Sequence, residues 1–86
     1  MKYRLKCDCF TGDYSKEYII SYKGPKKLNW SFVPVKDVIR KEYTGLVKVV
    51  LLDENSDTCL VEMNNLTEPK GKSRFLASKR DIVKGE

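Results

Sequence analysis

The sequence has no histidine, few cysteines and no long apolar run, and each absence narrows the range of functions. Without histidine, the commonest general base of enzymes is missing. No nucleophile-elbow, phosphate-loop, dinucleotide-binding or metalloprotease motif takes its place. We therefore expect a protein that is not an enzyme and that carries no cofactor.

The cysteines are Cys7, Cys9 and Cys59, an odd number without the spacing of a disulfide framework. Cys7 and Cys9 stand two residues apart, so they share one face of an extended strand. They could be half of a metal or redox site, or small apolar groups facing a core. Because the chain cannot supply four Cys or His ligands for zinc, we expect core packing and no metal.

The longest apolar run, Val49–Leu52, is far shorter than the roughly 20 residues of a membrane-spanning helix. The first ten residues alternate charged and apolar groups and do not resemble a signal peptide. These features predict a cytoplasmic protein without a membrane partner. Its 86 residues, 34% of them charged and 41% hydrophobic, predict one small folded domain over residues 1–86 with a thin core.

The net charge of +5 is unevenly distributed, because residues 1–43 hold ten Lys or Arg against five Asp or Glu, and residues 44–86 hold seven of each. This basic excess favours anionic partners, nucleic acid first, although solubility alone would also explain it. Asp53, Glu54 and Asp57 fall in one polar turn. We expect them to be solvated there and not to form a cation site.

Apolar and polar residues alternate over Lys2–Cys9, as in a half-buried antiparallel strand, and Glu17–Lys23 has the composition of its return strand. Leu46–Leu52 is apolar enough to be buried on both faces. Residues 36–43 have roughly helical spacing, which predicts at most one short helix there, ending near Gly45. Further strands are expected at Trp30–Val35, Thr58–Met63 and Ser73–Ser78, followed by an extended pair at Ile82 and Val83.

The two halves of the chain have similar order, which predicts an internal duplication of residues 3–39 and 46–83. Asp37-Val38-Ile39 aligns with Asp81-Ile82-Val83, and Phe32-Val33 aligns with Phe75-Leu76. The alternative is that hairpins with similar turns recur in any small β domain. In either case two units of about 40 residues should share one core, since neither can bury a sheet face alone.

These elements predict a mainly β, or β-rich α+β, domain of five to six short strands in a small antiparallel barrel or sandwich. Leu46–Val83 contains a hairpin, a Gly/Pro loop, a strand with Phe75 and a D-I-V ending. In this order it resembles small SH3-like barrels in general. The resemblance implies a fold and no particular function.

The candidate contact surface consists of two basic loops, Lys23–Lys27 and Pro69–Arg74. Cationic loops can neutralise phosphates, and neighbouring aromatic rings can stack on bases or anchor a protein partner. Trp30 and Phe32 follow the first loop, and Phe75 follows the second, although burial of these aromatics in the core is the alternative. Lysine outnumbers arginine 13 to 4, which suits non-specific phosphate contact. The predicted binding residues are Lys23, Lys26, Lys27, Trp30, Lys70, Lys72, Arg74, Lys79 and Arg80.

The sequence therefore predicts a non-catalytic binding module that acts on a protein partner, with Tyr14, Tyr18 and Tyr22 as further anchors near Trp30. The partner would be a larger protein or nucleoprotein assembly, and the size and composition suit an accessory protein or inhibitor of phage or viral type. The alternative is a small β-barrel that contacts DNA or RNA phosphates without sequence preference. A homodimer through an edge strand is a further expectation.

Overall fold

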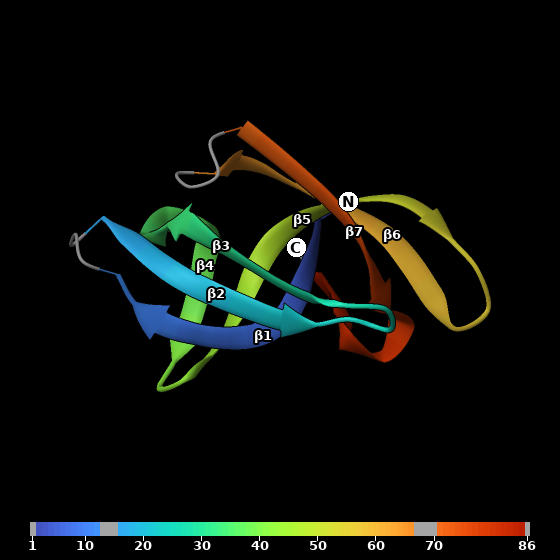
Figure 1. Ribbon diagram of the computed structural model, residues 1–86, viewed down its shortest axis with the longest axis horizontal. Coiled ribbons are helices and arrows are strands. Elements are labelled where there is room, and N and C mark those ends of the chain that lie inside the picture. Colours follow the sequence, from blue (N-terminus) through green and yellow to red (C-terminus); the bar gives the residue numbers. More distant parts are fainter. Residues whose placement is uncertain (1, 13–15, 67–70, 86) are drawn as a thin grey trace.

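The computed structural model describes residues 2–12, 16–66 and 71–85, without the side chains of 65, 71 and 72. The described residues form eight strands, all paired antiparallel, and two short 3-10 turns (Figure 1). In chain order the elements are β1 (Lys2–Thr11), β2 (Glu17–Lys23), β3 (Leu28–Pro34), η1 (Val35–Asp37), β4 (Val38–Lys41), β5 (Thr44–Glu54), β6 (Thr58–Leu66), β7 (Gly71–Ser78), η2 (Lys79–Asp81) and β8 (Ile82–Gly85).

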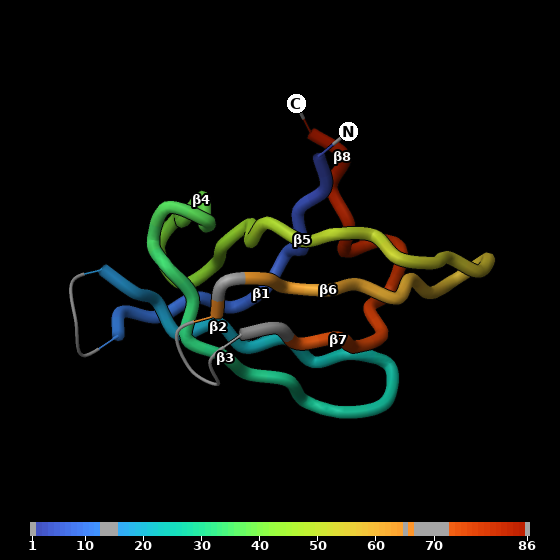
Figure 2. Tube along the Cα trace, turned by 90° about the horizontal axis from the view of Figure 1, so that it is seen from above, coloured from blue at the N-terminus to red at the C-terminus, as the bar shows by residue number. Residues whose placement is uncertain are grey.

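The long strands β1 and β5 pair at the centre of the sheet, with Leu5 opposite Val47. Each of them divides its other edge between two partners. The edge of β1 pairs with β8 over residues 2–5 and with β2 over residues 8–11, and the edge of β5 pairs with β4 over residues 44–47 and with β6 over residues 50–54. The sheet thereby curls into a nearly closed barrel with β3 and β7 at its ends (Figure 2).

Both halves of the chain run through the same element order, a long strand, two further strands, a 3-10 turn and a short strand. The last strand of each half pairs with the first strand of the other half, β4 with β5 and β8 with β1. Asp37 and Asp81 end the two 3-10 turns, as the alignment of the halves implies. Phe32 and Phe75 do not correspond in burial, because Phe32 is partly exposed and Phe75 is buried. The duplication itself stays a prediction.

One hydrophobic core serves both halves, as expected for units that cannot bury a face alone. Inward positions follow the period of two that a strand imposes, such as Leu5, Cys7 and Cys9 on β1. The core residues are Leu5, Cys7, Cys9, Ile20, Tyr22, Val33, Val47, Val49, Cys59, Val61, Met63, Leu66, Phe75 and Ala77. A small antiparallel β-barrel is therefore the architecture, as the alternation predicted.

The helix predicted over residues 36–43 is wrong. The chain makes the turn η1 and then the strand β4, whose backbone pairs with β5. A helix this short is unstable without packing, whereas β-branched Val38 and Ile39 favour a strand that a partner completes. Gly45 is not a helix stop but a buried β5 residue, where an added Cβ would lie 2.9 Å from Val38 Cγ1 and 3.0 Å from Cys9 Cβ.

Two other expectations about the strands need correction. The sheet has eight described strands, more than the five to six predicted. The prediction took β4 for part of a helix, and β8 is a paired strand of four residues. The strand β5 is not buried on both faces, since Val50 is 42% exposed and Leu52 is 41% exposed. Both residues come after the part of β5 that pairs with β1 and β4.

The tip of the β2–β3 hairpin lies against β7 and η2, where the sheet comes back on itself (Figures 1 and 2). The buried Tyr22 bridges this junction. Its hydroxyl accepts a hydrogen bond from the backbone N–H of Ser78 at 2.8 Å and donates one to Oδ2 of Asp81 at 2.7 Å. Its ring packs on Phe75, with the centroids 5.8 Å apart. Tyr22 thus joins the first half of the chain to the second.

We expect Tyr22→Phe to lower the free energy of unfolding by about 1–3 kcal/mol, because the N–H of Ser78 loses its acceptor and the Asp81 carboxylate loses a donor. The aromatic packing is kept, so the cost reports on the hydrogen bonds. Urea unfolding followed by circular dichroism measures it. Tyr43→Phe is the control, because Tyr43 is 68% exposed and the substitution should change little. Equal stability of the two variants would contradict the bridging role.

Candidate functional surface

The structure brings the first basic loop, Lys23–Lys27, next to strand β7. Lys26, Lys27 and Asn29 border a hollow of about 220 Å³ together with Phe75 and Leu76. A Cβ added to Gly24 would lie 2.6 Å from the carbonyl oxygen of Leu76, so only glycine permits this approach of hairpin and β7. Lys70 lies outside the described residues, and so does the side chain of Lys72.

Two of the predicted binding cations are instead held in ion pairs. Arg74 Nε lies 2.6 Å from Oε2 of Glu62, whose side chain is 8% exposed, and Lys79 Nζ lies 3.2 Å from Oε2 of Glu54. Arg80 is exposed beside Lys79 and Asp57, at the β5–β6 turn. In the part of the chain that the structure describes, no carboxylate is within ion-pair distance of Lys23, Lys26, Lys27 or Arg80.

Trp30 is not a core residue, since it is 57% exposed on the outer side of β3. Its ring meets Phe32 edge-on, with the centroids 5.9 Å apart. Across the hairpin, Trp30 lies opposite Ser21, and Phe32 lies opposite Ile19. Phe75, the third aromatic considered, is buried.

The apolar surface around Trp30 continues across three strands. On β1, Phe10 is opposite Ile19 and 43% exposed, and its ring centroid is 6.3 Å from that of Tyr43. At the other end of the hairpin, Leu28 is 60% exposed and opposite Lys23. The aromatic face, as we call it, consists of Phe10, Ile19, Leu28, Trp30, Phe32 and Tyr43.

Sequence reasoning missed Phe10, Leu28 and Tyr43. A signal was present for Phe10, because it continues the outward register of Lys6 and Asp8 on β1. The described tyrosines that were named as anchors, Tyr18 and Tyr22, are not part of this face. Tyr22 is buried, Tyr18 is half-buried with the Arg40 guanidinium 5.1 Å from its ring centroid, and Tyr14 lies outside the described residues.

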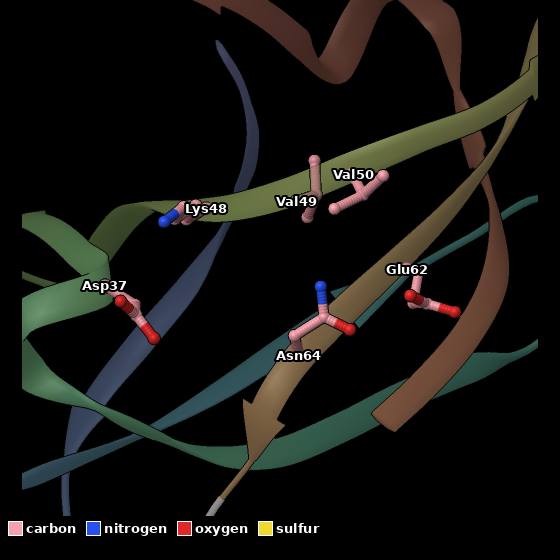
Figure 3. Close-up of a pocket in the computed structure, with 6 residues that line it drawn as sticks. All are labelled: Asp37, Lys48, Val49, Val50, Glu62 and Asn64. Carbon is pink, nitrogen blue, oxygen red and sulfur yellow. The ribbon is translucent and has the colours of Figure 1, made fainter. Parts of the chain in front are cut away.

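Asp53 and Glu54 at the end of β5 and Asp57 in the turn that follows are exposed, as expected, and Glu54 pairs with Lys79. A separate polar hollow of about 70 Å³ lies between β5, β6 and η1, bordered by Asp37, Lys48, Glu62 and Asn64 (Figure 3). Asn64 Oδ1 is buried there and has no hydrogen-bond partner among the described residues. Within the described residues, no three His, Cys, Asp or Glu side chains gather as a metal site would require.

All three cysteines are free and buried, which confirms their expected place in the core. The Cys7 thiol donates a hydrogen bond to the Gly45 carbonyl at 3.5 Å. Burial, followed by the charges of Cys9 and Asp8, raises the pKa of Cys7 from 9.0 to about 12. Burial also raises the pKa of Cys9 and of Cys59. Such thiols stay protonated and unreactive near neutral pH.

No family model, curated protein or solved structure matches the chain. The candidate surfaces are therefore distinguished by their own chemistry, by which side chains are exposed and which are already paired.

Within its described residues the structure has no helix that is both long and apolar enough to cross a membrane.

We expect stability to decline as the pH rises from about 9 towards 12. The unfolded chain loses the Cys7 proton near pH 9.0, whereas the folded chain keeps it to about 12. The contribution of Cys7 to the free energy of unfolding is thus complete below about pH 9, and it falls by up to about 1.4 kcal/mol per pH unit above that. Urea unfolding of wild type and Cys7→Ala at increasing pH measures this. Parallel stability profiles of the two proteins would contradict it.

We expect Arg74→Ala to lower the free energy of unfolding by about 1–2 kcal/mol, because the nearly buried carboxylate of Glu62 loses its partner. Arg80→Ala removes the same charge from an exposed site and should stay within about 0.5 kcal/mol of wild type. Thermal or urea unfolding compares them. If Arg74→Ala is as stable as Arg80→Ala, Arg74 is available for binding and is not a structural residue.

Proposed function

We propose that this protein is a non-catalytic binding module whose aromatic face docks on a protein partner. Lys23, Lys26 and Lys27 form a cationic rim at the tip of the β2–β3 hairpin. The observation that carries the proposal is the continuity of exposed and partly exposed apolar side chains across β1, β2 and β3, with Trp30 beside the rim.

Single exposed apolar residues are ordinary on protein surfaces, but a connected group is not. Here the connection is given by the pairing, since Phe10, Ile19 and Phe32 lie side by side across three strands. Trp30 and Leu28 extend this row towards the hairpin tip. Aromatic anchors within a polar rim are the usual composition of interface hot spots.

The charge of the rim indicates the chemistry of the partner. Lys23, Lys26 and Lys27 are exposed and have no carboxylate at ion-pair distance among the described residues. An apolar patch bordered by Asp or Glu would complement this surface. The partner class we propose is a larger protein or nucleoprotein assembly with such a patch. An accessory or inhibitory role of phage or viral type, in the cytoplasm, belongs to the same proposal.

Nucleic-acid contact through the two basic loops is the weaker candidate for this surface. Arg74 and Lys79 are engaged with Glu62 and Glu54, which reduces the charge available for phosphates. Aliphatic Ile19 and Leu28 offer no ring for bases to stack on. These two residues suit the apolar side chains of a protein.

We expect Trp30→Ala to weaken partner binding at least about tenfold, because truncating a central aromatic anchor costs about 2 kcal/mol or more. The control is Ile39→Ala, since Ile39 is also 57% exposed but lies on a different part of the sheet. A partner captured by crosslinking from host extract is purified and titrated calorimetrically with each variant. Trp30, the one tryptophan of the chain, should also become protected from acrylamide quenching in the complex.

Equal losses from Trp30→Ala and Ile39→Ala would contradict the proposal. So would a free protein that sediments as a dimer in which Trp30 is already protected. That outcome would assign the aromatic face, or the neighbouring edge of β3 that pairs with no described strand, to a second copy of this chain.

A further inference from the structure

The outer side of the central strands carries a group of cations that the basic loops do not include. We propose that this surface binds the phosphate backbone of a nucleic-acid duplex. It is formed by β8, β1, β5 and β4, which lie side by side in that order. The proposal is independent of the docking function of the aromatic face, which is built on β1, β2 and β3.

Register determines which residues share this surface. Leu5 and Cys7 of β1 point into the core, so Lys2, Arg4 and Lys6 point out. Arg4 lies opposite Lys48 on β5 and opposite Val83 on β8, and Lys6 lies opposite Leu46, which is opposite Ile39. The basic face, as we call it, consists of Lys2, Arg4, Lys6, Lys41 and Lys48.

Arg4 and Lys48 are like charges directly opposite each other in an antiparallel pair, an arrangement that destabilises a sheet. Arg4 is held in place, because its Nη1 donates to the carbonyls of Leu46 and Asp37, each at 3.2 Å. The guanidinium has further N–H groups beyond Nη1. A bound phosphate would accept from these and would relieve the repulsion.

Acidic residues border the basic face without cancelling it. Within the stretches where these four strands pair with one another, Asp8 is the one carboxylate at a described outward position, and it lies opposite Thr44. Asp81 lies with Asp8 around a hollow beside Lys6, and Asp37 lies with Lys48 at the hollow of Figure 3. In the described chain, neither Lys6 nor Lys48 has a carboxylate within ion-pair distance.

The described outward positions of the basic face carry no aromatic ring, and this favours a duplex over a single strand as the ligand. Its outward apolar residues, Ile39, Leu46 and Val83, are aliphatic, and no described outward position of β4, β8 or the stretches of β1 and β5 that pair here is aromatic. Proteins that hold unpaired bases stack them on aromatic rings. A lysine-rich surface without rings suits the sequence-independent contact of a phosphate backbone.

The test is fluorescence anisotropy of a labelled duplex of about 20 base pairs at about 50 and 200 mM salt. With roughly four phosphate contacts, binding should weaken on the order of 100-fold between these two concentrations. Lys6→Ala/Lys48→Ala should reduce the slope of log K against log salt by about 2. Lys6→Arg/Lys48→Arg should bind as the wild type does, because the charges are kept.

Lys26→Ala/Lys27→Ala is the matched control, since it removes the same charge from the hairpin tip. It should leave the slope unchanged, and so should Trp30→Ala, which tests the aromatic face alone. Equal effects of the two double alanine variants would overturn the proposal, and so would a larger effect at the hairpin tip. Absence of duplex binding at 50 mM salt would overturn it too, as would tighter binding to a single strand or to phosphatidylserine vesicles.

Discussion

The antiparallel pairing of β1 with β5 is the interaction on which the rest of the structure depends. Every other strand is attached to this pair directly or through one neighbour. Leu5 and Val47 meet at its middle, both almost fully buried, so the pairing joins the two halves of the chain and forms the centre of the shared core at once. Because each long strand also divides its second edge between two partners, the sheet has to bend there, and the bend produces a barrel.

Sequence patterns were sufficient for the fold class because alternation is a local property. Glu17–Lys23 was placed at its observed bounds, and the inward side of β1 was read correctly from Leu5, Cys7 and Cys9. Residues 36–43 were misread because their apolar spacing fits a helix and a short strand equally well. What decides between them is the free edge of β5, a partner far along the chain that a local pattern does not contain.

The candidate surface was predicted less well than the fold. Trp30 was named from the sequence, but which face of β3 it occupies depends on the register with β2. Its neighbours Phe10 and Tyr43 come from β1 and from the β4–β5 turn. The binding surface was predicted from the number of cations in and near the loops. Whether a cation is free to bind a partner depends on the tertiary structure, which brings Glu62 to Arg74 and Glu54 to Lys79. The sequence does show that charged residues of the central strands alternate with apolar ones and therefore point outward. Their position opposite one another followed only from the pairing.

The exchange of final strands between the halves has a consequence for how the protein is made. Residues 2–5 pair with residues 82–85, so the edge of β1 is completed only after the whole second half of the fold has been synthesised. Contacts of such long sequence separation slow folding, because the whole intervening chain must be ordered before they form. On the ribosome, the first half can bury its apolar face only partly while β5 and β8 are still to emerge. Until β8 has emerged, the nascent chain therefore exposes the edge of β1 that β8 later covers, and an exposed strand edge is a site where another chain can pair.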